Sequence, residues 1–227
     1  MMKLKHFYFN PFREHCGVIS DNTGNAAIVD PGAMTADELD SLESYIAAEG
    51  LKPAAILLTH AHFDHIYAVR HLQDKFNIPV YMHPDEKEVM KISAKDAARY
   101  NLPVPDTGFI TTDVLDSQTI CAGELRFTVI HTPGHSPGGV CYYDKADSIL
   151  FSGDTLFAGT IGRSDLGGGD YDKEIVSIME KLMVLDADTE LFPGHGCCSS
   201  IGYERTNNPF LEPFNEPEEL PVPDDGQ

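Results

Sequence analysis

The sequence predicts a single α/β domain built from two groups of strands, each followed by helices. Three observations lead to this class. A length of 227 residues fits one large domain. A content of 42% hydrophobic and 23% charged residues is ordinary for a soluble globular protein. Short apolar runs alternate with amphipathic runs of helical spacing, and the order along the chain returns twice from strands to a helix.

The first half is predicted to open with three strands, in the runs L-K-H-F-Y-F, C-G-V-I-S and A-A-I-V-D. The turn D-N-T-G-N makes a hairpin of the last two. A helix follows over residues 36–49, where leucine and isoleucine share one face and Gly50 stops the helix. After Pro53, the apolar residues 54–58 form a short buried strand. The amphipathic run I-Y-A-V-R-H-L-Q-D-K-F is a second helix.

The second half continues with the strand P-V-Y-M-H and a short helix at E-K-E-V-M. Residues 93–113 lack clear periodicity, so they form either a loop over the functional site or a connector. Strands are expected at L-R-F-T-V-I, G-V-C-Y-Y and S-I-L-F-S, then a helix over residues 172–185 and the strand E-L-F-P. We place the domain at residues 1–205. Residues 206–227 are Pro-rich and acidic, which predicts an irregular tail.

Charge and composition exclude several classes of partner. Sixteen basic residues stand against 36 acidic ones, for a net charge of −20, and this argues against binding nucleic acid. No run approaches the roughly 18 apolar residues that a membrane span needs. The N-terminal run shows no secretory signal pattern, and five cysteines without a C-x-x-C motif are typical of a reduced, cytoplasmic protein.

The most informative motif is T-H-A-H-F-D-H, which contains His60, His62, Asp64 and His65. In an extended chain, residues 60, 62 and 64 would face one side and residue 65 the other. Asp64 and His65 can therefore share a site only if the chain turns there. Because a strand precedes the motif and a helix follows it, we expect two histidines to serve one metal ion and the Asp-His pair a second ion.

Three further candidate ligands each lie in a Gly-containing turn: His135 in T-P-G-H-S-P-G, Asp154 in F-S-G-D-T-L-F and His195 in F-P-G-H-G. Imidazole suits zinc and iron, and a carboxylate can bridge two cations. The remaining histidines are interpreted as ordinary core or surface groups: His6, His15, His71, His83 and, close to the site but outside it, His131. Cys197 and Cys198 follow His195 closely, and we favour a small-residue turn over a metal ligand there.

With these motifs, and with G-D-T-L-F and G-R-S-D, the chain resembles a metallo-β-lactamase-fold hydrolase of the glyoxalase II-like (hydroxyacylglutathione hydrolase-like) branch. The resemblance covers about residues 1–200 and implies an αββα sandwich with the site at one rim of the paired sheets. It implies that His60, His62 and His135 hold one metal. It further implies that Asp64, His65 and His195 hold the second, with Asp154 bridging the two.

Two divalent transition-metal ions, zinc first and iron or manganese as alternatives, can generate a hydroxide that attacks an activated carbonyl. Asp64 both ligates and orients the attacking water, and it is the predicted catalytic residue. A thiolate leaves readily, so the predicted substrate is a small-molecule thioester or ester. The oligomeric state stays open.

The chain departs from full-length glyoxalase II in two ways. It ends before the C-terminal helical region by which those enzymes grip glutathione, so a different thioester is possible. Arg163 matches their basic substrate-contacting position, whereas Asp165 stands where they have an aromatic residue. Arg163 is accordingly predicted to bind substrate, with a salt bridge to Asp165 or Asp170 as the structural alternative.

Three other functions compete with thioester hydrolysis. The foremost is a mononuclear iron persulfide dioxygenase of the same fold, which retains similar His and Asp residues. A second is a binding or sensor protein that kept the metals and lost turnover. A true β-lactamase is disfavoured, because Asp154 occupies a bridging position that those enzymes do not use for Asp.

Overall fold

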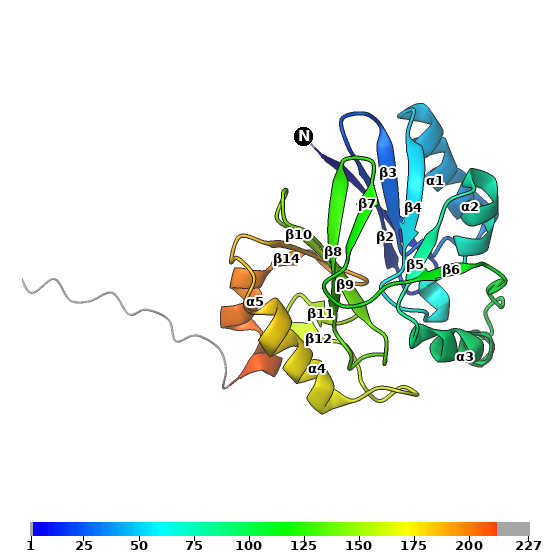
Figure 1. Cartoon of the computed structure of the whole chain (residues 1–227). Helices are drawn as coiled ribbons and strands as arrows, with labels where there is room; N and C mark the ends of the chain where they lie inside the picture. Colours follow the sequence, from blue (N-terminus) through cyan, green and yellow to red (C-terminus); the bar gives the residue numbers. More distant parts are fainter. Residues whose placement is uncertain (1, 213–227) are drawn as a thin grey trace, which may run out of the picture.

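The computed structural model describes residues 2–212 and shows two six-stranded sheets packed face to face. Helices α1, α2 and α3 cover the outer face of one sheet, and α4 and α5 lie on the outer side of the other (Figure 1). This arrangement confirms the αββα sandwich. Among the described residues, every helix is too short or too polar to cross a bilayer.

The first sheet has the order β1-β2-β3-β4-β5-β6. Its first three strands pair antiparallel, and the strands from β3 onward pair parallel. The strands are β1 (Lys3–Phe9), β2 (Glu14–Ser20), β3 (Asn25–Val29), β4 (Lys52–Leu57), β5 (Val80–Met82) and β6 (Thr111–Asp113), and the helices are α1 (Ala36–Ala48), α2 (Val69–Phe76) and α3 (Glu86–Arg99).

The second sheet has the order β14-β13-β10-β9-β8-β7, in which only β10 and β13 pair parallel. Its strands are β7 (Thr119–Ala122), β8 (Leu125–His131), β9 (Val140–Asp144), β10 (Ile149–Gly153), β13 (Glu190–Pro193) and β14 (Ser199–Ser200). A small hairpin, β11 (Leu156–Phe157) and β12 (Thr160–Ile161), follows β10. The helices are α4 (Tyr171–Ser177), which continues as a π-helical turn (Ile178–Leu182), and α5 (Ile201–Asn207).

The core has three apolar layers, one between the sheets and one beneath each helical layer. Ile19, Leu57, Phe127 and Tyr142 lie in the central layer and are fully buried. Because β3 and β9 are covered on both faces, they read in the sequence as continuous apolar runs rather than as alternating ones. At these two strands the sandwich presents the strand ends, rather than the sheet faces, to solvent.

One helix, α3, is longer than the sequence pattern predicts. A short helix was expected at residues 86–90 and irregular chain over residues 93–113, but α3 continues to Arg99. Its buried face consists of Glu86, Val89, Ser93 and Ala97. Two of these side chains are polar and one is a single methyl group, so the face carries too little hydrophobicity to show helical periodicity. Residues 100–110 then connect α3 to β6.

The chain packs against the domain as far as Leu211, whose side chain is 1% exposed and lies in the outer apolar layer of the second sheet. The short helix Pro209–Leu211 follows α5 directly. Of the predicted tail, residues 206–227, the part up to Leu211 falls in the end of α5 and in this short helix, and residues 213–227 lie outside the described residues.

Candidate metal centre

All seven predicted ligands meet at one rim of the sandwich, where strands from both sheets end. His60 and His62 follow β4, Asp154 follows β10 and His195 follows β13. Phe63–His65 forms a single 3-10 turn between β4 and α2. The expected turn at Asp64 and His65 is therefore present, and it delays the start of α2 to Val69.

The first cluster contains His60, His62 and His135, whose ligand atoms lie within 4.8 Å of one another. The Nδ1 of His62 and the Nε2 of His135 are 2.9 Å apart. The three rings stand nearly perpendicular to one another, with interplanar angles of 84–89°. Three imidazole nitrogens this close together could hold one metal ion.

The second cluster contains Asp64, His65 and His195, again with ligand atoms within 4.8 Å of one another. The Nε2 atoms of the two histidines are 3.3 Å apart, and the Oδ2 of Asp64 is 3.4 Å from the Nε2 of His195. These donors suit a divalent transition-metal ion as well as those of the first cluster do.

Asp154 lies between the two clusters. Its Oδ2 is 3.5 Å from the Nε2 of His135 and 3.6 Å from that of His195, and its Oδ1 is 3.5 Å from the Nε2 of His65. One carboxylate thus faces ligands of both clusters, which is the geometry a bridging ligand needs. The Gly in P-G-H-G makes room for it, because a Cβ on Gly194 would come within 2.3 Å of the Oδ1 of Asp154.

Two buried atoms show that the donor set fits metal ions. Among the described residues, neither the Nε2 of His60 nor the Oδ1 of Asp154 has a hydrogen-bond partner. A buried polar atom without a partner is costly, and a metal–ligand bond would remove that cost.

The pKa values of the histidines separate the two clusters. Burial lowers the pKa of His60, of His135 and of His62, the last to about 3, so the first cluster is neutral and able to donate lone pairs. Burial also disfavours charge on His65 and His195, but Asp154 and Asp64 raise both pKa values above the usual one. A metal entering the second cluster would therefore displace protons.

Asp30 supports the second cluster and was not predicted as a site residue. Its Oδ2 accepts from the Nδ1 of His65 at 3.2 Å and from the Thr59 hydroxyl at 2.5 Å, while its Oδ1 accepts from the Thr59 N–H at 2.7 Å. It therefore fixes the tautomer of His65 and the strand end before His60. The sequence signalled Asp30 only as the end of a strand.

Glu174 supports the first cluster from α4. Its carboxylate accepts the backbone N–H of His135, and burial raises the pKa of Glu174 to about 8. The Nδ1 of His135 meets the carbonyl oxygen of Arg163 at 2.8 Å. The ring and the backbone of His135 are thus both bound by residues far away in the sequence.

A cavity of about 600 Å³ opens over the two clusters. The first half of the chain lines it with Phe12, Phe63 and Tyr100, whose ring centroids lie 5.2–5.7 Å apart. The second half contributes Phe157, Ile161 and Leu166. The size and apolar lining fit a small organic molecule whose reacting group rests on the metal ligands.

Arg163 lies at this cavity, but its guanidinium is engaged by Asp165. Nε donates to Oδ1 at 2.8 Å and Nη2 to Oδ2 at 3.0 Å, and both side chains are largely exposed. Asp165 raises the pKa of Arg163. The salt bridge between Arg163 and Asp165, the alternative to substrate binding, is therefore present. Substrate binding by Arg163 stays a prediction.

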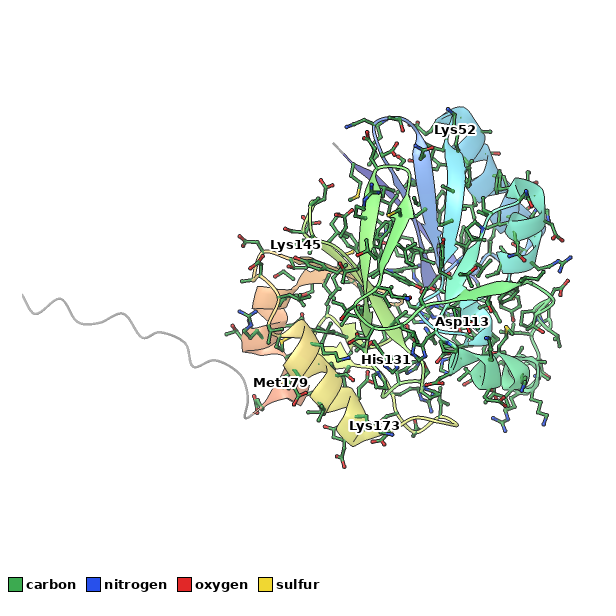
Figure 2. The ribbon with its side chains drawn as sticks, viewed as in Figure 1. Lys52, Asp113, His131, Lys145, Lys173 and Met179 are labelled. Carbon is green, nitrogen blue, oxygen red and sulfur yellow. The ribbon has the colours of Figure 1, made fainter. Side chains whose placement is uncertain are left out.

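His131 lies outside both clusters, at the end of β8 (Figure 2). Its ring stacks on that of His83 at 4.1 Å and 10°, and its Nε2 meets the Pro137 carbonyl at 3.1 Å. Asp85 and the two histidines also have ligand atoms within 4.8 Å of one another, but the His83 Nδ1 accepts the Asp85 N–H at 3.3 Å and the His131 Nε2 is engaged by the Pro137 carbonyl. We therefore assign no metal to this pair.

The family model described as "Metallo-beta-lactamase superfamily" matches residues 10–195. A probable metallo-hydrolase of Bacillus subtilis, YqgX, is 38% identical over 87% of this chain and 92% of its own length. The hydroxyacylglutathione hydrolase GloC of Haemophilus influenzae is 34% identical over 92% of this chain and 98% of its own.

Solved structures agree with this family. The crystal structure of BLEG-1, described as a B3 metallo-beta-lactamase, has a TM-score of 0.85 at 38% identity, covering 92% of this chain and all of that one. TTHA1623, crystallised in a di-iron-bound form, has a TM-score of 0.82 at 36% identity, covering 91% of this chain and all of its own.

Replacing Asp154 tests the bridge. Asp154→Ala should release metal and lower the melting temperature, because an ion that binds only the folded state stabilises that state. Metal per chain is measured by elemental analysis and stability by thermal unfolding. His131→Ala, the control, should retain its metal. An Asp154→Ala protein with unchanged metal content would show that Asp154 is no ligand.

Proposed function

Because the chain belongs to the metallo-beta-lactamase superfamily, we propose that this metallo-hydrolase cleaves small-molecule thioesters with two bound transition-metal ions, zinc first among them. The observation that carries the proposal is the pair of three-ligand clusters with Asp154 between them, beneath an apolar cavity. The relative named as a hydroxyacylglutathione hydrolase supports the thioester class.

Two bound metal ions would supply an activated water and polarise the substrate carbonyl. The protein's part is to position those reactants. Burial opposes charge on Asp64, but His65 and His195 hold its pKa below the usual range, so the carboxylate is ionised and can accept a proton from water as it orients it. The aromatic residues of the cavity exclude solvent from the reacting group.

The groups lining the cavity favour a leaving group that needs no proton. Outside the two clusters and Asp154, Asp96 is the one carboxylate among the described lining residues, and its Oδ1 accepts from the Nη1 of Arg99 at 2.7 Å. No imidazole outside the clusters lines the cavity in this part of the chain. A thiolate departs without a separate general acid, whereas an amine requires one.

A second candidate function is β-lactam hydrolysis, which the likeness to the B3 metallo-beta-lactamase BLEG-1 favours. The amide nitrogen of a β-lactam must be protonated as it leaves, and that proton would have to come from Asp64 after it has accepted one from water, whereas a thiolate leaves without it. We therefore place thioester hydrolysis first. Persulfide oxidation at a single iron is the third outcome to be tested.

The test combines metal analysis with three assays on one purified sample. We expect close to two transition-metal ions per chain and hydrolysis of S-acyl glutathione or a simpler thioester. Turnover of a chromogenic β-lactam with inert thioesters would replace the proposal by the second candidate. One iron per chain with oxygen uptake on glutathione persulfide would replace it by the third.

Arg163→Ala tests anionic substrate binding. If a substrate carboxylate displaces Asp165 from the guanidinium, the variant should raise KM for a charged thioester and keep its metal. A charge-assisted hydrogen bond contributes about 1.5–3 kcal/mol, so kcat/KM should fall about 10- to 150-fold. A neutral thioester should be affected much less. Equal losses on both, with a lower melting temperature, would mean that Arg163 only supports its loop.

Tyr100→Ala tests the aromatic lining. Removing the ring should lower kcat/KM for a thioester with an aromatic acyl group about fivefold or more, since an aromatic contact contributes about 1 kcal/mol. An acetyl thioester should change less than about twofold. Tyr171→Ala is the matched control, because Tyr171 is 52% exposed against 51% for Tyr100 but does not line the cavity. Equal effects on both acyl groups would exclude a role in selectivity.

A further inference from the structure

Glu86, the first residue of α3, is a fully buried carboxylate that the hydrolytic chemistry does not use. Its Oε2 accepts the backbone N–H of Ala61 at 2.7 Å, and its Oε1 accepts that of Gly138 at 2.8 Å. Burying a carboxylate is costly unless its oxygens receive hydrogen bonds, and here each oxygen has a backbone donor.

The two donors belong to the two loops that form the first metal cluster. Ala61 stands between His60 and His62 in the sequence, and Gly138 belongs to the same turn as His135. One carboxylate therefore ties together the backbones that carry all three imidazoles of that cluster.

The same helix holds Ala61 a second time. Ser93 lies two turns after Glu86 on the buried face of α3, and its hydroxyl donates to the Ala61 carbonyl at 2.5 Å. The N–H and the C=O of the residue between two ligands are thus both bound by α3. Backbone held at both polar groups has little freedom to shift.

Gly138 allows the close approach that this contact needs. A Cβ at this position would come within 2.8 Å of the Glu86 nitrogen and 2.9 Å of the His83 Nδ1. The final residue of T-P-G-H-S-P-G is thus glycine for a steric reason: without a side chain, the turn can approach the start of α3 closely enough for this hydrogen bond.

The second cluster is held by other groups. His65 is oriented by Asp30, and the Nδ1 of His195 meets the Phe12 carbonyl at 3.1 Å. The two backbone hydrogen bonds of the Glu86 carboxylate go to neither that cluster nor a neighbour of His195. A change at Glu86 should therefore separate the two metal sites.

We propose that Glu86 is a positioning residue for one metal site: it sets the metal affinity of the His60–His62–His135 cluster and leaves that of the Asp64–His65–His195 cluster unchanged. The competing explanation is that Glu86 only stabilises the start of α3, where an acidic residue interacts favourably with the helix dipole. That role would lower global stability and act on both metal sites alike.

The test is Glu86→Gln in the full chain, stripped with a chelator and titrated with Co²⁺ while the visible absorption bands are followed. Glutamine keeps the shape but turns an N–H₂ group toward one of the two backbone donors, so one hydrogen bond is lost. His62→Ala and His195→Ala proteins supply the reference spectra of the single sites. Losing such a supporting contact typically costs about 10- to 100-fold in metal affinity.

Glu204→Gln is the matched control. Glu204 is also fully buried, and its Oε2 accepts the Gly159 N–H at 2.8 Å and the Asn208 Nδ2 at 2.8 Å, outside both clusters and the cavity. We expect Glu204→Gln to lower the melting temperature and keep both Co²⁺ affinities within about threefold of those of the unaltered protein.

The expected result for Glu86→Gln is a loss of about tenfold or more in affinity at the first cluster, with the second within about threefold. Equal changes at both sites, or none, would overturn the proposal. If Glu86→Gln does not fold, Ser93→Ala can be tested instead, because it removes the hydrogen bond from the Ser93 hydroxyl to the Ala61 carbonyl. It should lower the Co²⁺ affinity of the same first cluster. A Ser93→Ala protein with both affinities intact would also overturn the proposal. The measurement needs no substrate, so it stands apart from the thioester assay.

Discussion

The site depends on one carboxylate, 12% exposed, that is placed among imidazoles. Asp154 has four histidine nitrogens within 3.9 Å, and no single element supplies them: they follow β4, β8 and β13. Such a group is stable only where positive charge compensates it, either from protons on His65 and His195 or from metal ions. This compensation is possible because the strand ends of both sheets meet at one rim. The close approach of His195 and Asp154 there requires a glycine at position 194, where a Cβ would contact the Asp154 carboxylate.

Much of the candidate site could be predicted from the sequence, because four of its residues are so close in the sequence that local geometry decides where they lie. His60, His62, Asp64 and His65 stand in one short motif, and the turn that they require is the 3-10 turn observed. The fold followed partly from apolar runs, but the αββα arrangement rested on the resemblance. The length of α3 could not be read, because its buried face carries Glu86 and Ser93 in place of aliphatic residues.

Asp30, Glu86 and Glu174 escaped sequence reasoning for a different reason. Each is a buried carboxylate that accepts at least one backbone N–H at or beside a candidate ligand, and a backbone donor has no residue identity that a sequence could show. The acidic residues behind the net charge of −20 therefore fall into two groups, one at the surface and one in the interior. Most acidic residues lie at the surface, whereas these few are part of the interior and hold the loops at the rim in place.

The two ends of α3 contact different parts of the site. Its first residue binds the backbone of Ala61, between two candidate metal ligands, while its last residue, Arg99, and the following Tyr100 line the cavity. Fourteen residues of helix separate these ends by about 21 Å. Substitutions at Arg99 or Tyr100 would therefore reshape the cavity far from the backbone that Glu86 holds. Evolution or an engineer could vary the lining of this scaffold while its candidate metal centre stays constant.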